Sequence, residues 1–210
     1  MNFQNRTQAG EKLAQQIAAL HPADPIVLAI PREGVAVARP VADALACPLD
    51  VIPLMKLPIP WSAEASYGVV AMDGTMVWNR SLMNRLDLSE RELEMAASAF
   101  TEEAKRRERV YRKDEPFPDL ERKTVVLIDD GLGSGYSMLA AVHFTRKRNP
   151  GSMIIAAPVI SDIAYRLLAA EAGVDRILAL VRDVEQYFSL KTYFSDYSFL
   201  TDDDVIRTLG

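Results

Sequence analysis

Short apolar runs alternate with amphipathic stretches over most of the chain. An unbroken apolar run at 26–30 has the character of a strand buried on both faces, which is typical of parallel sheets. Similar runs lie at 49–56, 125–128, 153–160 and 176–181, and helical periodicity is found at 7–20, 35–45, 137–148 and 162–172. Strands separated by helices predict the α/β class, as a doubly wound, mostly parallel five-stranded sheet with strand order 2-1-3-4-5.

The middle of the chain departs from this alternation. Asp73-Gly74 lies between two apolar-rich arms and predicts a β-hairpin over 67–78, in a turn whose two central residues both need positive φ. Ser89 with Glu92 forms a capping box, which predicts a long charged helix reaching about residue 112. We therefore expect one domain over 1–210, with an insertion at about 57–118 and a tail at about 183–210.

Composition narrows the function classes. A net charge of −5 argues against non-specific binding to nucleic acid or to an anionic membrane. The single cysteine, Cys47, fits a reducing compartment, and two histidines without a cysteine pair nearly exclude a zinc site. The first residues lack the apolar core of a signal peptide, and no apolar run is long enough to span a bilayer. We expect a cytoplasmic protein.

The segment with the most chemical information is 125–137, Val-Val-Leu-Ile-Asp-Asp-Gly-Leu-Gly-Ser-Gly-Tyr-Ser. A buried strand ends at the carboxylates of Asp129 and Asp130, and a three-glycine loop then leads to Ser137 at the mouth of a helix. Glycines allow close approach of the backbone to a ligand, and free N–H groups at a helix start suit phosphate. The two acids can accept hydrogen bonds from sugar hydroxyls and help to hold Mg²⁺. Together these groups predict a ligand that carries both a ribose and a phosphate.

Other interpretations of this loop are weaker. It is not a P-loop, because no Lys-Ser or Lys-Thr follows the last glycine, and a dinucleotide-binding loop would lack the acid pair. A response-regulator receiver carries its acid pair after the first strand, near the chain start. A purely structural turn, with acids capping the helix, remains the alternative.

The segment resembles the signature of type I phosphoribosyltransferases, which bind 5-phosphoribosyl-1-pyrophosphate (PRPP). Their loop ends in Thr-Gly-x-Thr, and here serines replace both threonines, at Ser134 and Ser137. The resemblance implies that Asp129 and Asp130 contact the ribose hydroxyls and lie close to Mg²⁺, directly or indirectly. It also implies a 5′-phosphate site formed by Gly131, Leu132, Gly133, Ser134, Gly135, Tyr136 and Ser137.

The chain is also similar to a little-characterised branch of that family. The branch has a Phe-x-x-Arg-x-x-Ala-Gly opening, matched from Phe3 to Gly10, and an aromatic-acidic tail, matched at 193–197. It carries a Pro-Arg-Gly-Gly loop after the first strand, where this chain has Glu33 in place of a glycine, and a Lys after the second strand. The resemblance implies a pyrophosphate site formed by Arg32, Glu33, Gly34 and Lys56, with Arg32, Lys56, Asp129 and Asp130 as the catalytic set.

The acceptor is left open. Purine-salvage relatives carry a third loop acid where this chain has Gly133, which argues against a 6-oxopurine handled in that way. The family places a mobile flap where the 57–118 insertion lies, although Trp61, Tyr67 and Trp78 could simply pack the hairpin. The tail aromatics could form a hood that stacks on a base, or pack against the core or against a second subunit in a homodimer. Because Glu33 brings a negative charge to the pyrophosphate loop, a non-catalytic PRPP- or nucleotide-binding regulator is the alternative to an enzyme.

Overall fold

A computed structural model of the chain describes residues 2–59, 62–86, 89–185 and 187–210. Its main sheet is fully parallel, with the strand order β2-β1-β6-β7-β8. These strands are β1 (Pro25–Ala29), β2 (Leu49–Val51), β6 (Thr124–Ile128), β7 (Ser152–Ser161) and β8 (Arg176–Asp183). The predicted fold class and strand order are confirmed.

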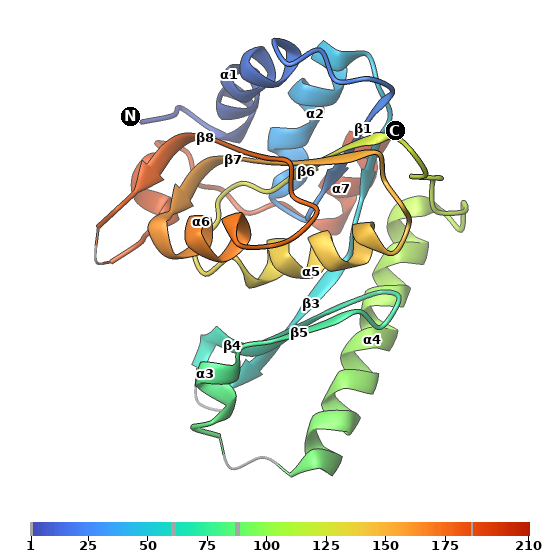
Figure 1. The fold of residues 1–210 in the computed structure, drawn as a ribbon, viewed down its shortest axis with the longest axis vertical. Helices are drawn as coiled ribbons and strands as arrows, with labels where there is room; N and C mark the ends of the chain where they lie inside the picture. Colours follow the sequence, from blue (N-terminus) through green and yellow to red (C-terminus); the bar gives the residue numbers. More distant parts are fainter. Residues whose placement is uncertain (1, 60–61, 87–88, 186) are drawn as a thin grey trace.

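Helices cover both faces of this sheet, as Figure 1 shows. One face carries α1 (Arg6–Ala18), α2 (Gly34–Leu45) and α7 (Asp202–Leu209), and the other carries α5 (Tyr136–Arg146) and α6 (Asp162–Ala169). Successive strand residues serve opposite faces: Val27 and Ala29 pack with α1 and α2, whereas Ile26 and Leu28 pack on the side of α5. This explains the unbroken apolar runs, because β6 and nearly all of the neighbouring strands β1 and β7 are buried on both faces.

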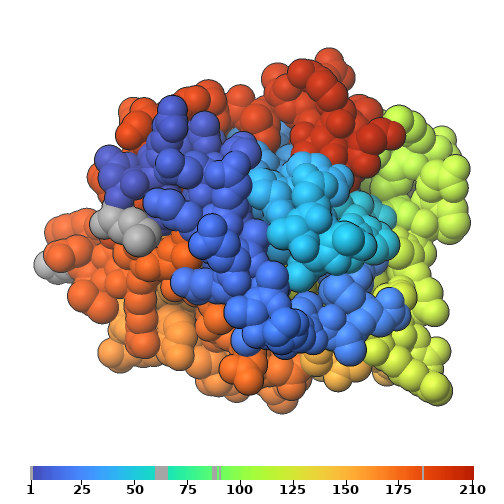
Figure 2. Space-filling model, turned by 90° about the horizontal axis from the view of Figure 1, so that it is seen from above, coloured from blue at the N-terminus to red at the C-terminus, as the bar shows by residue number. Residues whose placement is uncertain are grey.

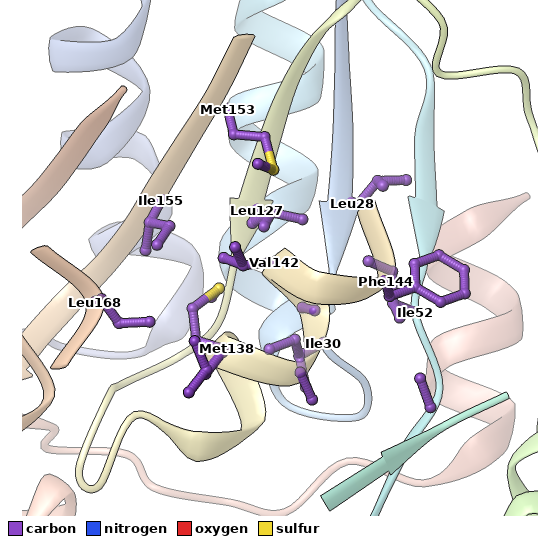
Figure 3. Close-up of a cluster of buried hydrophobic side chains, with 14 of the residues drawn as sticks. Leu28, Ile30, Ile52, Leu127, Met138, Val142, Phe144, Met153, Ile155 and Leu168 are labelled. Atoms are coloured by element: carbon purple, nitrogen blue, oxygen red, sulfur yellow. The ribbon is translucent and has the colours of Figure 1, made fainter. Parts of the chain in front are cut away.

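The core on the α5 side is built from large aliphatic side chains of the strands and one helix. Leu28, Leu127 and Ile155 project from neighbouring strands toward Met138 and Val142 of α5 (Figure 3). Each of these side chains is almost fully buried, and burying one such aliphatic group stabilises a fold by about 1.5–3 kcal/mol. This packing fixes the start of α5, and with it the loop between β6 and α5.

The insertion forms a second, antiparallel sheet of order β3-β4-β5, flanked by a long helix (Figure 1). Its elements are β3 (Leu54–Ile59), β4 (Ser62–Ala71), β5 (Met76–Trp78), α3 (Arg80–Met83) and α4 (Glu90–Arg112). The single strand predicted at 49–56 is therefore wrong. The chain leaves the main sheet after Val51, and Leu54 begins a strand of the smaller sheet, with Pro53 unable to supply a ladder N–H between them.

Two local predictions in the insertion fare differently. The capping box of α4 is confirmed: Ser89 accepts from the Glu92 backbone N–H, and the Glu92 side chain accepts from the Ser89 N–H. The hairpin is also present, but its predicted turn is wrong, because Gly74 has positive φ (79°) and Asp73 does not. The Ala71 N–H donates to the Thr75 carbonyl, which closes a three-residue loop that needs only one left-handed residue.

The tail returns to the start of the chain. It comprises the short 3-10 helix η1 (Leu190–Tyr193) and α7, and between them Phe194 forms a parallel bridge with Phe3. In Figure 2 the blue N-terminal residues and the red C-terminal residues share one face of the molecule, beside α2. Pro40 lies inside α2 and does not mark its start.

Candidate active site

A cavity of about 680 Å³ opens where the main sheet meets the insertion. It lies at the carboxyl edge of β1 and β6, the two neighbouring strands at which the connections wind in opposite directions. Doubly wound sheets bind their ligands at this place. The cavity is lined by Ile30, Pro31, Arg32, Glu33, Leu54, Met55, Lys56, Arg107, Asp129, Asp130, Gly131, Ser137, Leu190, Tyr197 and Phe199.

The acid pair stands at the end of β6, on the floor of this cavity. The Asp129 Oδ1 atom accepts a 2.8 Å hydrogen bond from the Asp130 backbone N–H, which orients the first carboxylate. Burial and the neighbouring charge of Asp130 raise the pKa of Asp129 well above its usual range, opposed by the cation of Lys56. Burial also raises the pKa of Asp130, opposed by Arg6. Two adjacent buried carboxylates favour ligands that bring hydroxyl donors or a cation.

Arg6 is a site residue that sequence reasoning missed. Its Nε donates a 2.8 Å hydrogen bond to Oδ2 of Asp130, and only 5% and 11% of the two side chains are exposed. Its Nη1 donates to the Ser198 carbonyl at 2.6 Å. The sequence signal was the arginine of the Phe3–Gly10 opening, but nothing in that motif indicates that it reaches a carboxylate 124 positions away.

The glycine-rich loop joins the acid pair to α5 and is anchored at one end. Leu132 bridges to Ile160: its N–H donates to Val159 and its carbonyl accepts from Ser161, so its amide is not free for a phosphate. Its side chain is in the core, and Tyr136 also packs against that core. Among the residues predicted to bind phosphate, Leu132 therefore has a structural role. The backbone amides left for an anion are those at the end of the loop.

The start of α5 carries the properties of an anion site. Gly135 has φ of 82° and takes the N-cap position, and no described side chain caps the helix. The first N–H groups of a helix lack partners within the helix and attract anions. Ser137 lines the cavity and adds a hydroxyl, while Ser134 is exposed at the loop surface. Gly133 faces Phe188, whose ring carbons lie 3.2 and 3.3 Å from where a Cβ would stand.

The loop after β1 lies across the cavity and leads into α2. It contains a cis Pro31–Arg32 peptide bond, and Gly34 packs so closely that an added Cβ would lie 3.2 Å from the Asp129 Cα. The Arg32 guanidinium is half-exposed and lies 3.8 Å from a carboxylate oxygen of Asp202 in α7. The Glu33 carboxylate accepts from the Leu200 N–H at 3.4 Å, so it faces the tail.

Two further cations line the cavity from the insertion. Lys56 is exposed on β3, and its charge partly offsets the rise in the pKa of Asp129 that burial and Asp130 cause. Arg107 lies on α4, 2.9 Å from Glu103, in the helix that the sequence predicted only as long and charged. Lys105, Arg106 and Arg107 all pair with acids of the same helix, and Arg107 also lines the cavity. Helical periodicity alone could not show which turn of α4 passes the site.

The tail covers the loop, as a hood would. A Cβ on Gly131 would fall 2.3 Å from the Leu190 side chain, so only glycine allows η1 to lie so close. Tyr197 and Phe199 line the cavity, with ring centroids 5.9 Å apart in an edge-to-face arrangement. Phe194 instead packs on Phe3, at 5.5 Å between ring centroids. Phe194 therefore packs within the protein, whereas Tyr197 and Phe199 face the cavity.

The hairpin of the insertion is tied to the body of the domain. Val69 and Val77 join the core cluster that contains α5, and Tyr67 stacks on Trp78 with ring centroids 6.1 Å apart. The alternative in which Tyr67 and Trp78 pack the hairpin therefore holds for these two side chains. Trp61 lies outside the described residues.

Mg²⁺ would find few protein ligands here. Among the described residues, no group of three or more His, Cys, Asp or Glu side chains is placed to hold a metal ion. Mg²⁺ commonly takes one or two carboxylates and completes its shell with water and substrate phosphates. The acid pair fits that mode, with Asp129 the more available member because Arg6 occupies an oxygen of Asp130.

Comparison with known proteins identifies the family. The family model described as the phosphoribosyl transferase domain matches residues 72–186, which include the acid pair and its loop. The chain belongs to this family. This phosphoribosyltransferase domain is similar to the crystal structure of TT1426 from Thermus thermophilus, with a TM-score of 0.81 and 32% identity, over 100% of this chain and 98% of that one.

More distant matches agree on the fold. A purine phosphoribosyltransferase from Pyrococcus horikoshii superposes with a TM-score of 0.50 and 16% identity, over 93% of this chain and 91% of that one. The Mycobacterium tuberculosis protein named "Putative phosphoribosyl transferase Rv0571c" is 28% identical over 207 residues, 99% of this chain and 46% of its own length. The chain thus spans about half the length of the curated relatives it matches.

Within the described ranges, no helix combines the length and the apolar character needed to cross a bilayer.

Proposed function

We propose that this chain is a PRPP-dependent phosphoribosyltransferase that transfers ribose 5-phosphate to a nitrogen nucleophile. In the reaction, the bond between the anomeric carbon and the pyrophosphate oxygen breaks, and pyrophosphate leaves with the electron pair. The acceptor nitrogen forms the new bond to that carbon and releases its proton to solvent or to the departing pyrophosphate. The transition state carries positive charge on the sugar.

The observation that carries this proposal is the convergence of two helix starts on one acid pair. The α5 start would seat the 5′-phosphate, and the α2 start with Arg32 would face the pyrophosphate. Asp129 and Asp130 lie between them, where the ribose hydroxyls of such a ligand would be. This arrangement matches the shape of PRPP, which carries one anionic group at each end of a ribose.

Catalysis would rest on positioning and on charge. Lys56, Arg32 and Arg107 bring positive charge to the side where pyrophosphate leaves, and the acid pair brings negative charge close to the sugar carbon. Bound Mg²⁺ would neutralise the leaving group, held by Asp129 together with the substrate's own oxygens. The tail over the loop would keep water from capturing the sugar.

We propose a nucleobase as the acceptor. Tyr197 and Phe199 form an aromatic wall in the cavity, and flat heterocycles stack on such walls. Gly133 leaves no loop carboxylate to take a proton from the base, which favours an acceptor whose nitrogen attacks without that help.

The direct test measures pyrophosphate release from Mg²⁺-PRPP over a panel of nucleobases and amines. Release that depends on one class of acceptor would support the proposal and name the acceptor. Asp129→Asn serves as the control, because it keeps the size of the side chain and its acceptor oxygen while removing the charge. Equal release by this variant and by the natural protein would contradict the assigned site.

One observation favours a regulator that binds PRPP or a nucleotide without reaction. Glu33 stands in the loop that would face pyrophosphate, and its negative charge adds to the rise that burial causes in the pKa of Asp130. Its carboxylate turns toward Leu200, however, which moves the charge off the loop backbone. Tight Mg²⁺-PRPP binding in calorimetry without pyrophosphate release from any acceptor would favour the regulator.

A further inference from the structure

The beginning of the chain and its tail are joined by backbone hydrogen bonds. The Phe3 N–H donates to Tyr193 at 2.8 Å, and the Phe3 carbonyl accepts from the Ser195 N–H at 2.9 Å. The Asp196 N–H donates to Gln4 at 2.8 Å. This short parallel ladder brings Arg6, two residues beyond Gln4, into contact with Tyr197 and Ser198 of the tail.

Arg6 contacts this part of the tail in two ways. Its Nη1 donates to the Ser198 carbonyl at 2.6 Å, and its guanidinium carbon lies 4.5 Å from the centre of the Tyr197 ring. The same guanidinium uses Nε to hold Asp130. One buried side chain therefore connects an acid of the sugar site with the aromatic wall of the cavity.

Glu33 contacts the same tail segment from the loop after β1. Its carboxylate accepts from the Leu200 N–H, two residues beyond the carbonyl that Arg6 holds. Arg6 contacts Asp130 and Tyr197, and Glu33 contacts Leu200 of the same segment. Ser198 and Leu200 are thus fixed at backbone level by two charged side chains on either side of Phe199.

We propose that Arg6 and Glu33 form a clasp that positions residues 197–200 as the acceptor wall, with Arg6 also orienting Asp130. Both are positioning residues for acceptor recognition, and Glu33 has a role that explains its presence in the loop. This inference rests on the proposed function, because it assigns the wall to the acceptor. Its physical core is the link between the tail and the sugar site.

The geometry requires arginine at position 6. A guanidinium presents several donors in a rigid fork, so one group can serve Asp130 and Ser198 together. A lysine brings the same charge on a single nitrogen. It can pair with Asp130 but cannot also donate to the Ser198 carbonyl. Arg6→Lys therefore separates the two links, and Arg6→Met removes both while keeping an apolar stem.

The test compares Arg6→Lys, Arg6→Met and Glu33→Ala in steady-state kinetics and in hydrogen exchange. Loss of one hydrogen bond to the tail should raise the acceptor KM by about 10-fold in Arg6→Lys and Glu33→Ala. The KM for PRPP should stay within about 3-fold in these two variants and rise strongly only in Arg6→Met, which leaves Asp130 without its cation. Amides in 194–200 should exchange faster in all three variants.

The matched control is Lys12→Met on the same helix. Lys12 lies 5.5 Å over the Phe3 ring and is also a cation close to the N-terminal segment. Its loss should leave both KM values and the exchange of 194–200 unchanged. The clasp would be overturned if the amides of residues 194–200 in Arg6→Lys exchanged at the wild-type rate. It would also be overturned if this substitution raised the KM values for PRPP and for the acceptor equally.

Hydrogen exchange does not depend on turnover. If the natural protein releases no pyrophosphate with any acceptor, the proposed function fails, and exchange in the Arg6 and Glu33 variants still decides whether the clasp exists. If turnover occurs and these substitutions leave hydrogen exchange in residues 194–200 unchanged, the clasp is wrong and the proposed function stands.

Discussion

Two loops face each other across the cavity, and they are built on opposite principles. Each follows a central strand of the sheet, β1 or β6, and each leads into a helix whose start no described side chain caps. The loop after β6 is rich in glycine and is tied to β7 through Leu132. The loop after β1 carries the charges Arg32 and Glu33, and both of these contact the tail.

Under the proposed function, the difference shows how the two ends of one ligand would be held in different ways. The proposed phosphate site is made of backbone amides and is encoded locally, in glycines and in a helix start. A charged loop depends on distant residues that set where its side chains point, here Asp202 and Leu200. The loop after β6 should lose ligand binding when its backbone is disturbed. The loop after β1 should lose ligand binding when its distant contact residues change.

The largest effect is expected for the backbone seat. Gly135→Val places a branched side chain at φ of 82°, with its Cβ 3.2 Å from Ala164 of α6, so the loop must shift. We expect a loss of about 2–3 kcal/mol in the free energy of unfolding and a drop of at least ~100-fold in kcat/KM. Denaturant unfolding and the pyrophosphate-release assay measure the two quantities.

Gly74→Val is the control for backbone conformation. Gly74 has φ of 79° in the hairpin turn, and an added Cβ there meets nothing within 4 Å. This variant should be destabilised by positive φ alone and should keep its melting shift with Mg²⁺-PRPP, which corresponds to about 2.7 kcal/mol at ~100 times the dissociation constant. If Mg²⁺-PRPP raised the melting temperature of Gly135→Val as much as that of the wild-type protein, the proposed phosphate site at the start of α5 would be contradicted.

The charged loop should respond to loss of its cation. Arg32→Met keeps the aliphatic stem and removes the guanidinium from the pyrophosphate side, so kcat/KM for PRPP should fall by about 10–100-fold with little change in stability. The binding of ribose 5-phosphate, which has no pyrophosphate, should be unaffected in calorimetry. An equal loss for both ligands would assign Arg32 to the sugar phosphate instead.

The acid pair between the loops should make stability depend on pH. Folding raises both carboxyl pKa values, so the folded chain keeps protons that the unfolded chain has lost. The pair therefore favours folding fully at pH below about 4, and this contribution is lost as pH rises through the raised values. Asp129→Asn should be more stable than the natural protein at neutral pH by ~1 kcal/mol, about 2–4 °C in Tm.

Urea unfolding of both proteins over pH 4–8 checks this sign. The stability difference should grow with pH across the window and should shrink toward its acid end. A variant that is less stable than the natural protein at neutral pH would show that the Asp129 charge is satisfied in the free protein.

The smallest effect is expected from the acid in α7 that pairs with Arg32. Asp202 lies 3.8 Å from Arg32 and accepts a 2.7 Å hydrogen bond from the Tyr111 hydroxyl. Asp202→Asn keeps an oxygen for Tyr111 and removes the charge that holds Arg32, so we expect a change of only about 2–5-fold in the KM for PRPP. Raised ionic strength should reduce the difference between the two proteins.

Local patterns predicted most of the scaffold and named several residues that line the cavity. Apolar runs marked the buried strands because both faces of the sheet are covered, and Ser89 with Glu92 marked the start of α4 by a contact within four residues. The loop at 129–137 was visible for the same reason: strand, acids, glycines and helix start are contiguous in the chain.

Contacts between distant segments were not visible. Arg6 and Arg107 stand on helices whose sequences look like ordinary amphipathic helices, and only the packed structure shows what their side chains meet. The break between β2 and β3 was also missed, because apolar residues continue on both sides of Pro53. A change of sheet is a tertiary event, and it leaves little trace in periodicity.

The ladder between Phe3 and the tail has a consequence for how the protein is made. The hydrogen bond from Arg6 to Ser198 spans 192 positions, so it belongs to the contacts of greatest sequence separation. Such contacts form late, since closing a long chain segment costs entropy before it is rewarded. In a chain emerging from the ribosome, the strands up to β8 could pair before residues 193–200 are available, so the contact between Arg6 and Ser198 would form after the main sheet.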